Sequence, residues 1–434
     1  MKKIPTLIFA RMCQFFAQYG VRTLMVLYLI ESLKKGDAEA LALNAIFVTL
    51  FEVGSTFGGV IADRLLGFKR TLLLGGALLT LGFSSLIWSD QLILSFGLLI
   101  LGGNLFSSNV PALIGRELAD DEKRQKKVFI HMYALQNLGA LAAIPLLSFL
   151  KEFYGYTPPF LLAGAVMGIC VLALSFIHVE EKIHSQKGSW KGVGGLLAMP
   201  LIAFLFMQNK QLATTGLIIL GIVLALIFLK KIFTPGIILH EKRGPLLVAL
   251  FAIVIFFAVE DQTLSTFILF AERVCHRDLL GMTLPASLVA MMNPIVIALF
   301  SPLIARSKKR IVLPFIISGI ALLGLSLTAS TSIMPLLMVV AIISLSELYI
   351  GPLVYQAAAD SAHEEKRGEV MGVVPIAFSL AFILSGLLSR LVVAGQGVSQ
   401  MAAFMSGFQK MSILLLMAGL GLLLVQKKRE VVMA

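Results

Sequence analysis

Charged residues are scarce in this sequence. Asp, Glu, Lys and Arg make up 14% of the 434 residues, whereas they make up about a quarter of an ordinary soluble domain. Hydrophobic residues make up 58%. Because so few charges cannot cover a surface that faces water, the composition excludes a soluble globular protein and predicts a polytopic membrane protein.

Cysteines and enzyme motifs are also scarce. Cys13, Cys170 and Cys275 are scattered, without a CxxC pair or the spacing of a metal site, so we expect buried apolar fillers. The sequence has no GxSxG, no HExxH, no Walker loop and no GxGxxG after a strand. We therefore expect neither an enzyme nor a nucleotide-driven pump, and no metal or cofactor.

The formal charge of +12 does not predict nucleic-acid binding, because the basic residues lie in short connectors between apolar segments. Lys2 and Lys3 precede a long apolar run without a small-residue cleavage site. We expect this run to be the first membrane span rather than a cleaved signal peptide.

Apolar segments of about 20 residues, which suffice to cross a bilayer, occur in sets of six, two and six. They lie at roughly 5–32, 40–62, 70–88, 91–115, 127–149 and 159–178, then 192–208 and 212–233, then 246–271, 284–305, 311–329, 334–358, 370–393 and 405–425. We expect an all-α membrane protein with about 14 transmembrane helices.

Lysines and arginines crowd alternate connectors. The basic connectors lie at 64–70, 116–127, 182–191, 230–243, 306–310, 366–367 and 427–429. By the positive-inside rule, both termini are expected in the cytoplasm. The compact loops favour a bacterial inner membrane.

Charged connectors with Gly and Pro mark the boundaries of two halves. We expect an N-terminal six-helix bundle at 1–179, a linker with two additional helices at 180–245, and a C-terminal six-helix bundle at 246–434. Two six-span halves joined by a central linker are typical of major facilitator transporters.

The connector after the second apolar segment reads GGVIADRLLGFKR from Gly58 to Arg70. It resembles the major facilitator loop motif GGxxADRxxGxxR. The glycines permit close helix packing, and Asp63, Arg64, Lys69 and Arg70 are expected to pair at a cytoplasmic gate. The resemblance implies a major facilitator fold: two six-helix bundles plus two extra helices between them.

A polar stripe lies inside the first apolar segment. Arg11, Gln14, Gln18 and Arg22 are three, four and four residues apart, so they share one face of a helix. Each charge costs about 2.5 to 3.5 kcal/mol at the bilayer centre on insertion scales. The stripe is therefore expected to face protein or a wet cavity.

Further stretches resemble the proton-dependent oligopeptide transporter family of this superfamily. Residues 19–29 are similar to its YYGMR…LYL, 104–110 to GLFKPNV, 133–140 to YMGINLGA, 261–273 to FEQ…LFAER, 285–294 to PASWFQSLNP and 347–352 to EL…P. The match follows the chain in order through most of its length. It implies proton-driven symport of di- and tripeptides.

This chain also departs from the family pattern. The family's first-helix ExxERF falls on Arg11, Gln14, Phe15 and Phe16, so both carboxylates and the arginine of that motif are absent.

Five further departures lie in the expected pocket. The position of a family lysine holds Ser107, that of a pocket tyrosine holds Glu52, and that of the seventh-helix glutamate holds Asp261. The next tyrosine after the family's YG pair is Gln18, and Glu260 is an added acid.

The resemblance implies a zwitterion held between Arg22 at its carboxylate and Glu347 at its amine. Asn137 and Asn293 would assist Glu347. The other residues expected to bind substrate are Tyr19, Gln18, Glu52 and Ser107. Alternatives stay open: Arg22 pairs structurally with Glu52 or a seventh-helix acid, Glu347 and the asparagines bridge helices, and Tyr19 only packs.

Four acids, Glu52, Glu260, Asp261 and Glu347, stand against two arginines at these positions. Buried carboxylates in such excess should bind a proton or pair with a cation. We therefore expect these four acids to be the candidates for proton coupling.

The leading hypothesis is a secondary active transporter that couples protons to symport of di- or tripeptides or peptide-like solutes by alternating access. The pocket charge favours neutral or cationic solutes. The alternatives are a facilitator or exchanger of another small solute, such as an amino acid or amine, and a transporter-like sensor without turnover. The expected partners are the solute and the lipid bilayer, with no nucleic acid, and we expect a monomer.

Overall fold

The computed structural model describes residues 2–180, 190–207, 210–279, 281–304, 311–361, 370, 372–393, 395 and 398–433. The chain divides into two compact units. Unit 1 comprises Met1–Lys35 and Phe47–Ala213, and unit 2 comprises Gly36–Ile46 and Thr214–Ala434. The helix α2 (Asp37–Val53) therefore begins in unit 2 and ends in unit 1.

Most of the predicted spans appear as long apolar helices. Within the described ranges, nine helices are long and apolar enough to cross a membrane, and three shorter ones are apolar. The helices α1 (Lys3–Glu31) and α4 (Phe68–Ser85) account for the remaining two predicted spans. The predicted all-α membrane fold is confirmed; the boundaries at 179 and 245 and the cytoplasmic termini stay predictions.

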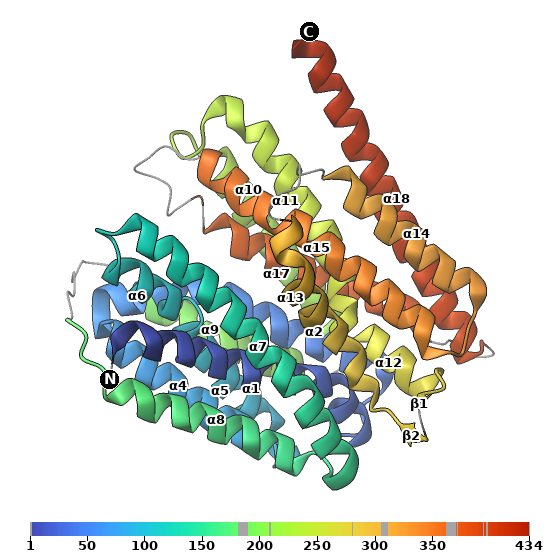
Figure 1. The fold of residues 1–434 in the computed structure, drawn as a ribbon, viewed down its shortest axis with the longest axis horizontal. Coiled ribbons are helices and arrows are strands. Elements are labelled where there is room, and N and C mark those ends of the chain that lie inside the picture. The colour runs from blue at the N-terminus through green and yellow to red at the C-terminus, as the bar shows by residue number, and fades with distance from the viewer. Residues whose placement is uncertain are drawn as a thin grey trace. The chain divides into compact units, whose positions relative to one another are not determined.

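Unit 1 is built around α1, which packs against α7 (Glu122–Tyr154) and α8 (Thr157–Ser175), while α4 packs against α5 (Leu92–Phe106) and α8 (Figure 1). Its other elements are α3 (Ser55–Ile61), the π-helical turn η1 (Ala62–Leu66), the 3-10 turn η2 (Ser89–Gln91), α6 (Asn109–Glu117) and α9 (Trp190–Met207).

The contact between α3 and α5 depends on glycine. A Cβ atom on Gly58 would overlap the backbone of Asn104, and one on Gly54 would overlap the Asn104 side chain. Asn104 Nδ2 donates to Leu50 O at 3.3 Å, and Asn109 Nδ2 donates to Gly58 O at 3.1 Å. The close helix packing predicted from the loop motif is confirmed at Gly58.

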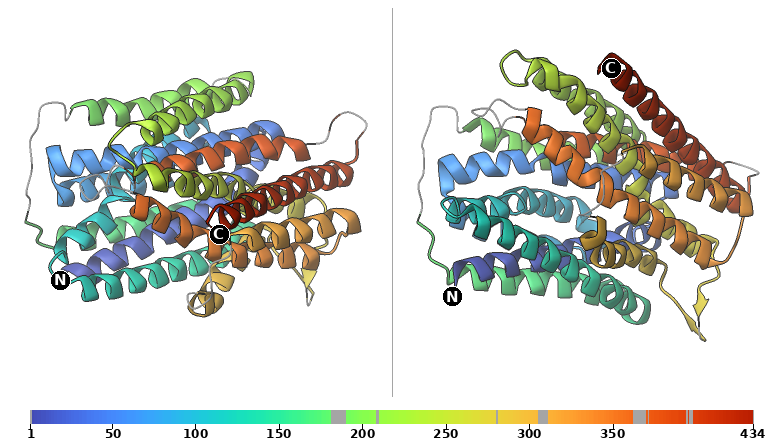
Figure 2. Two further views of the ribbon diagram at one scale, coloured as in Figure 1. Left: turned by 90° about the horizontal axis from the view of Figure 1, so that it is seen from above. Right: turned by 45° about the horizontal axis from the view of Figure 1, so that its top comes forward.

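In unit 2, α11 (His240–Glu260) packs against α17 (Val373–Leu388) and α15 (Ile333–Ser361), and α14 (Val312–Thr328) packs against α15 and α18 (Gln400–Met433) (Figure 2). The other elements are α10 (Lys210–Phe233), whose first residues belong to unit 1, η3 (Asp261–Leu264), α12 (Thr266–Arg273), β1 (Asp278–Leu279), β2 (Met282–Thr283), η4 (Ala286–Met291), α13 (Met292–Ile304) and η6 (Ser389–Val392).

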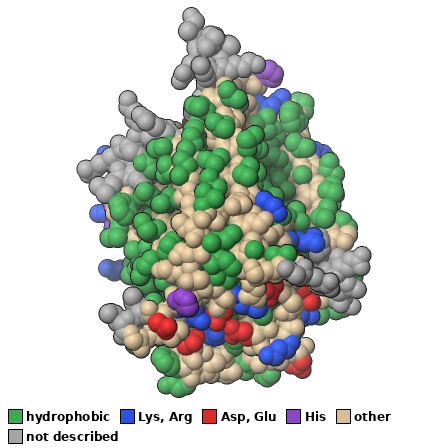
Figure 3. Space-filling view, turned by 90° about the vertical axis from the view of Figure 1, so that its right-hand side faces the viewer, with side chains coloured by type: hydrophobic (Ala, Val, Ile, Leu, Met, Phe, Trp, Pro, Cys, Tyr) green, Lys and Arg blue, Asp and Glu red, His purple; other side chains and the backbone are tan. Residues whose placement is uncertain are grey.

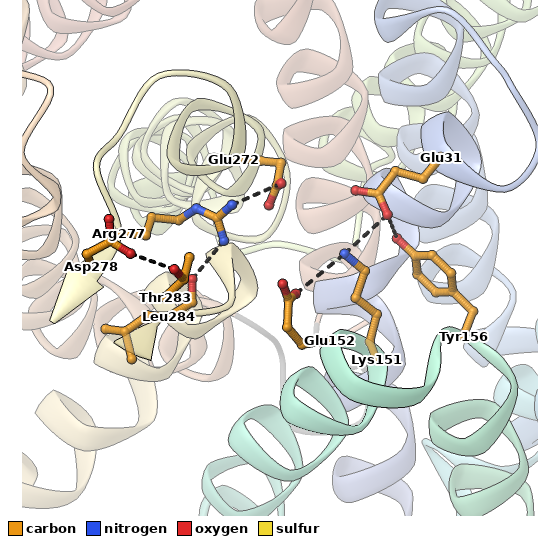
Figure 4. Close-up of polar contacts among 9 residues, drawn as sticks. All are labelled: Glu31, Lys151, Glu152, Tyr156, Glu272, Arg277, Asp278, Thr283 and Leu284. Atoms are coloured by element: carbon orange, nitrogen blue, oxygen red, sulfur yellow. Dashed lines mark hydrogen bonds and ion pairs between the residues drawn. The ribbon is translucent and has the colours of Figure 1, made fainter. Parts of the chain in front are cut away.

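Polar contacts tie the end of α1 to the α7–α8 turn in unit 1. Tyr156 Oη donates to Glu31 Oε2 at 2.7 Å, and Lys151 Nζ lies 3.1 Å from the same oxygen (Figure 4). Glu152 adds a carboxylate oxygen 3.8 Å from Lys151 Nζ. Glu31 of α1 thus joins the end of α7, through Lys151, to the start of α8, through Tyr156.

In unit 2, Arg277 fixes the short hairpin of β1 and β2. Its Nη2 lies 3.0 Å from Glu272 Oε1, and its Nη1 donates to Leu284 O at 2.7 Å (Figure 4). Thr283 Oγ1 donates to Asp278 Oδ1 across the hairpin at 2.5 Å. Arg277 therefore anchors both ends of the connector that follows α12.

The three cysteines are free and buried, as their spacing predicted. Cys275 lies in the connector after α12, where burial raises the pKa of its thiol to about 11. At neutral pH this thiol is therefore uncharged and a poor nucleophile.

Many large apolar side chains face outward. Hydrophobic side chains gather over much of one face in Figure 3. Examples from several helices are Leu81, Ile169, Leu201, Met338 and Met417, each exposed by more than half. So much exposed apolar surface is stable only against lipid, which identifies an integral membrane protein.

Candidate functional site

The polar stripe of α1 faces protein in unit 1, as its cost in a bilayer predicted. Gln14 is 1% exposed and Arg22 is 8% exposed. Gln14 Nε2 donates to Gln18 Oε1 at 3.3 Å and to Ser107 Oγ at 2.5 Å. The stripe therefore meets the end of α5, where Ser107 replaces the family's lysine.

Arg11 is the centre of this network. Its Nη1 donates to Gln14 Oε1 at 2.7 Å and to Ser107 O at 3.0 Å, and its Nε donates to Gln136 Oε1 on α7 at 3.1 Å. The planar guanidinium thus spans three helices with bonds of fixed direction. Its Cζ also lies 4.6 Å from the centroid of the Phe15 ring.

Glu52 is the acid of this region. Both Arg11 and Arg22 attract its carboxyl group electrostatically. The structure thus brings together three of the charged residues that the sequence placed on the first two spans. It fits the structural alternative for Arg22, a pair with Glu52, as well as the substrate role, because a guanidinium can serve both.

Tyr19 and Asn137, the remaining predicted residues of unit 1, each contact a residue of their own helix. Tyr19 stacks on Phe15 with ring centroids 5.0 Å apart. Asn137 Nδ2 donates to Tyr133 O, one turn earlier on its own helix, at 2.8 Å. Tyr133 is 44% exposed. Gln136, the neighbour of Asn137 on α7, accepts a hydrogen bond from Arg11 on α1.

In unit 2, Asn293 lies between two of the predicted acids. Its Nδ2 donates to Glu347 Oε2 at 2.6 Å and is 3.5 Å from Glu260 Oε1. Because both distances are measured from one nitrogen, the two carboxylate oxygens are at most 6.1 Å apart. An amide N–H here occupies a position that suits a positively charged nitrogen.

Asp261 points to a different neighbour than Glu260. Its side chain is 3% exposed, and its Oδ2 accepts a hydrogen bond from Ser385 Oγ on α17 at 2.6 Å. The two adjacent acids therefore serve two separate clusters of unit 2, one around Asn293 and one around Ser385.

The predicted gate residues lie around the turn between α3 and α4. Asp63 and Arg64 belong to η1, and Gly67, with φ of 79°, begins the turn into α4. Lys69 Nζ donates to Ser175 O at the end of α8, 3.0 Å away. Arg70 is exposed. Their pairing at a gate stays a prediction.

Sequence reasoning missed three residues of these clusters: Gln136, Gln262 and Ser385. The sequence did offer one indication: each of the three is a hydrogen-bonding side chain within an apolar span. Among the described residues, no group of three or more His, Cys, Asp or Glu is placed to hold a metal ion.

The family model of the Major Facilitator Superfamily matches residues 7–386. Dipeptide and tripeptide permease A of Cronobacter turicensis is 26% identical over 416 residues, which cover 88% of this chain and 83% of the permease. Dipeptide and tripeptide permease B of Shigella dysenteriae serotype 1 is 24% identical over 416 residues, covering 88% of this chain and 85% of that permease.

Solved structures show the same fold. A peptide transporter POT in complex with sulfate matches with a TM-score of 0.84 and 22% identity, covering 98% of this chain and 94% of that one. A POT family transporter in complex with 5-aminolevulinic acid matches with a TM-score of 0.85 and 19% identity, covering 98% and 96%. The resemblance to oligopeptide transporters is confirmed, and the matched proteins are transporters rather than enzymes.

Proposed function

Because the chain belongs to the Major Facilitator Superfamily, we propose that it is a secondary transporter of small peptides or peptide-like solutes. It acts by alternating access in a bacterial inner membrane, as a monomer and without a cofactor, with the proton gradient as the driving force. The names of the bacterial permeases in the comparison support the peptide assignment, and the neighbour bound to 5-aminolevulinic acid supports including peptide-like amines.

The observation that carries this proposal is the arrangement of Glu347, Asn293 and Glu260 in unit 2. Glu347 and Glu260 each place a carboxylate oxygen within 3.5 Å of the Asn293 amide nitrogen. A substrate ammonium group would find two acceptors there. We therefore assign the amine end of the solute to Glu347, with Asn293 beside it.

The carboxylate end is assigned to unit 1. Arg22 supplies the guanidinium, and Ser107, Gln18, Tyr19 and Asn137 supply neutral hydrogen-bonding groups. Since Ser107 replaces a lysine of the family pattern, this end binds a carboxylate less strongly than in the family. The preferred solutes are accordingly neutral or cationic.

Proton coupling is assigned to the acids rather than to α1. Gln14 and Arg11 stand where the family has carboxylates, so they cannot carry the proton. The remaining carriers are Glu52, Asp261, Glu260 and Glu347. Arg11 and Arg22 both interact with Glu52, and Asp261 Oδ2 accepts a bond from Ser385 Oγ. We place the transported proton on Asp261 or Glu52.

The test is uptake into proteoliposomes under an imposed inward proton gradient. The assay uses radiolabelled dialanine, with a panel of di- and tripeptides and 5-aminolevulinic acid as competitors. We expect competition by several peptides and a loss of uptake when the gradient is collapsed. Failure of every peptide to compete, while another solute is taken up, would disprove the peptide assignment.

Proton coupling has its own test in the double variant Glu52→Gln with Asp261→Asn. We expect gradient-driven uptake to be lost in this variant. If gradient-driven uptake persists, the coupling acids have been assigned wrongly.

One observation favours a second candidate, an exchanger without proton coupling. Arg11 and Gln14 stand where the family pattern has the two carboxylates of its first helix, and neither side chain can carry a proton at physiological pH. Solute uptake that is insensitive to an imposed pH gradient would indicate such a transporter. Solute binding without flux in either direction would instead indicate a sensor.

A further inference from the structure

The helix that runs from α11 into α12 is broken at Asp261, near the middle of a predicted span. The α-helix ends at Glu260, a 3-10 turn follows over Asp261–Leu264, and Ser265 leaves helical geometry with φ of −140° and ψ of −86° before α12 begins. Such a break frees backbone carbonyls that must find partners inside the protein.

The Gln262 side chain supplies hydrogen bonds at this break and links it to α17. Gln262 Nε2 donates to Ala258 O at 3.1 Å and to Ser385 O at 3.1 Å. Since a carbonyl oxygen only accepts, these two bonds fix which end of the amide is the nitrogen. The Gln262 Oε1 correspondingly accepts from Ser389 Oγ at 3.0 Å and from Thr266 Oγ1 at 2.5 Å.

The fixed amide decides the direction of the bond between Ser385 and Asp261. Gln262 Nε2 also donates to Ser385 Oγ, 2.7 Å away, so one of its two hydrogens is shared between the carbonyl and hydroxyl oxygens of Ser385. The serine hydroxyl thus acts as an acceptor towards Gln262. Its own hydrogen is then available to Asp261 Oδ2, 2.6 Å away. A charged carboxylate can only accept, which matches this arrangement.

Protonation of Asp261 on that oxygen would reverse the contact. The carboxyl group would become a donor, and the Ser385 hydroxyl would have to turn its hydrogen elsewhere or move away. Ser385 and Asp261 are 1% and 3% exposed, so water cannot readily replace the lost bond. A change in the charge of Asp261 therefore changes a hydrogen bond to α17 directly.

Several elements surround the contact between Asp261 and Ser385. Those that pack most extensively against the 3-10 turn are α11, α12, α17 and η4. The ranges of α17 and η4 contain no charged residue. Glu260 ends α11 beside Asp261 and has its own contact with Asn293, while α12 has Glu272 and Arg273 only at its far end.

The next residue of α17 extends the contact to α2. A Cβ atom on Gly386 would overlap Ala45, which belongs to the part of α2 in unit 2, and would lie 3.2 Å from Leu217 Cδ1 on α10. A shift of α17 at Ser385 would consequently be passed to α2 within one residue, because this packing leaves no space.

We propose that Ser385 is a positioning residue for coupling: it transmits the protonation of Asp261 from the broken helix to α17. This inference rests on the proposed function, in which Asp261 is one of the proton carriers. The Ser385 hydroxyl donates to Asp261 and accepts from Gln262, so we expect its loss to impair coupling more than solute exchange.

The experiment compares Ser385→Ala, Ser385→Thr and Ser385→Cys with the wild type in proteoliposomes containing the full chain. Two rates are measured for dialanine: gradient-driven accumulation and counterflow exchange without a gradient. The control is Ser379→Ala, because Ser379 is equally buried on α17 but its Oγ donates only along its own helix, to Pro375 O at 2.9 Å.

We expect Ser385→Ala to lower accumulation about tenfold, the effect of losing one hydrogen bond to a charged group, with exchange changed less than about twofold. Ser385→Thr keeps the hydroxyl group and restores accumulation. Ser385→Cys, a weaker donor, gives an intermediate value and serves if the alanine variant does not fold. Ser379→Ala leaves both rates unchanged.

A merely structural role would lower both rates together in Ser385→Ala. That result, unchanged accumulation in Ser385→Ala, or failure of Ser385→Thr to restore accumulation overturns the inference. If the wild type itself exchanges dialanine but never accumulates it, the proposed function fails at that stage and the inference with it. The wild-type measurement thus distinguishes the two failures.

Discussion

The polar clusters of the two units differ in charge. In unit 1, Arg11 donates to amide groups and to a backbone carbonyl: Gln14 and Gln136 lie within α1 and α7, and Ser107 lies in the turn between α5 and α6. In unit 2, Glu260, Glu347 and Asp261 accept bonds beside a helix that is broken.

This difference separates a fixed charge from charges that can change. A guanidinium keeps its proton at every physiological pH, so the Arg11 network has one charge state. Carboxyl groups that share one amide, or that accept from a hydroxyl at the 3-10 turn, can gain a proton and rearrange. The Arg11 network of unit 1 thus resembles a fixed receptor surface, whereas the acids of unit 2, like Glu52 in unit 1, can respond to protonation.

The strongest test of the comparison is Glu347→Gln. We expect peptide uptake to fall about 100-fold, because the amide cannot pair with a substrate ammonium and leaves the Asn293 amide with a poorer acceptor. Proteoliposome uptake measures the effect. Glu241→Gln, an exposed acid on α11, is the matched control. Uptake within threefold of the wild type would remove Glu347 from the site.

Gly58→Ala tests whether unit 1 is rigid. The new Cβ would overlap the Asn104 backbone, which we expect to cost about 2 to 3 kcal/mol of stability as α3 and α5 move apart. Thermal unfolding of the purified protein measures the cost. Gly59→Ala is the control, since its Cβ would meet no atom within 4 Å. Equal melting temperatures for the two variants would show that unit 1 yields as readily as a loop.

Arg11→Lys distinguishes fixed geometry from charge alone. Lysine keeps the positive charge near Glu52 but cannot reach Gln14, Ser107 and Gln136 together. We expect a loss of about 1 to 2 kcal/mol in stability, again from thermal unfolding. Arg124→Lys, an exposed arginine on α7, should change nothing. If Arg11→Lys is also neutral, the network contributes charge but no fixed geometry.

The smallest effect is expected from Glu260→Gln. Its 3.5 Å distance to Asn293 is long, so its contribution is mainly the added negative charge. We expect the half-inhibitory concentration of lysyl-alanine to rise about threefold relative to that of dialanine, because a weak charge pair contributes a free energy of that order. Half-inhibitory concentrations in the uptake assay measure the ratio. An equal change for both peptides would exclude a role in selecting cationic solutes.

Hydropathy predicted the helices well because burial in lipid leaves a long apolar run in the sequence. The first span was expected at 5–32 and α1 covers Lys3–Glu31. The break at Asp261 was not predicted, because residues 260–266 contain neither Gly nor Pro. Its signal is a run of hydrogen-bonding side chains, Glu260 to Thr263 with Ser265 and Thr266, which can take over freed backbone groups.

The site was predicted in part for a similar reason. The acids and arginines stood out because charges are rare in these spans. On α7 the sequence singled out Asn137, to assist Glu347, which stays a prediction; it did not single out Gln136, which accepts from Arg11 in the structure. One residue turns a helix face by about 100°, and only the packing of α7 against α1 decides which side chain meets Arg11.

The division of α2 between the two units has a consequence for inheritance. Arg273 Nη2 on α12 donates to Asp37 Oδ1, 2.9 Å away and 236 positions earlier in the chain, so unit 2 includes a piece encoded within the N-terminal half. Recombination between relatives that exchanged whole halves at the central linker would pair this piece with a foreign α12 and α17. We therefore expect the two halves to be inherited together, or an exchanged half to be accompanied by changes at residues 36–46 that match the new α12 and α17.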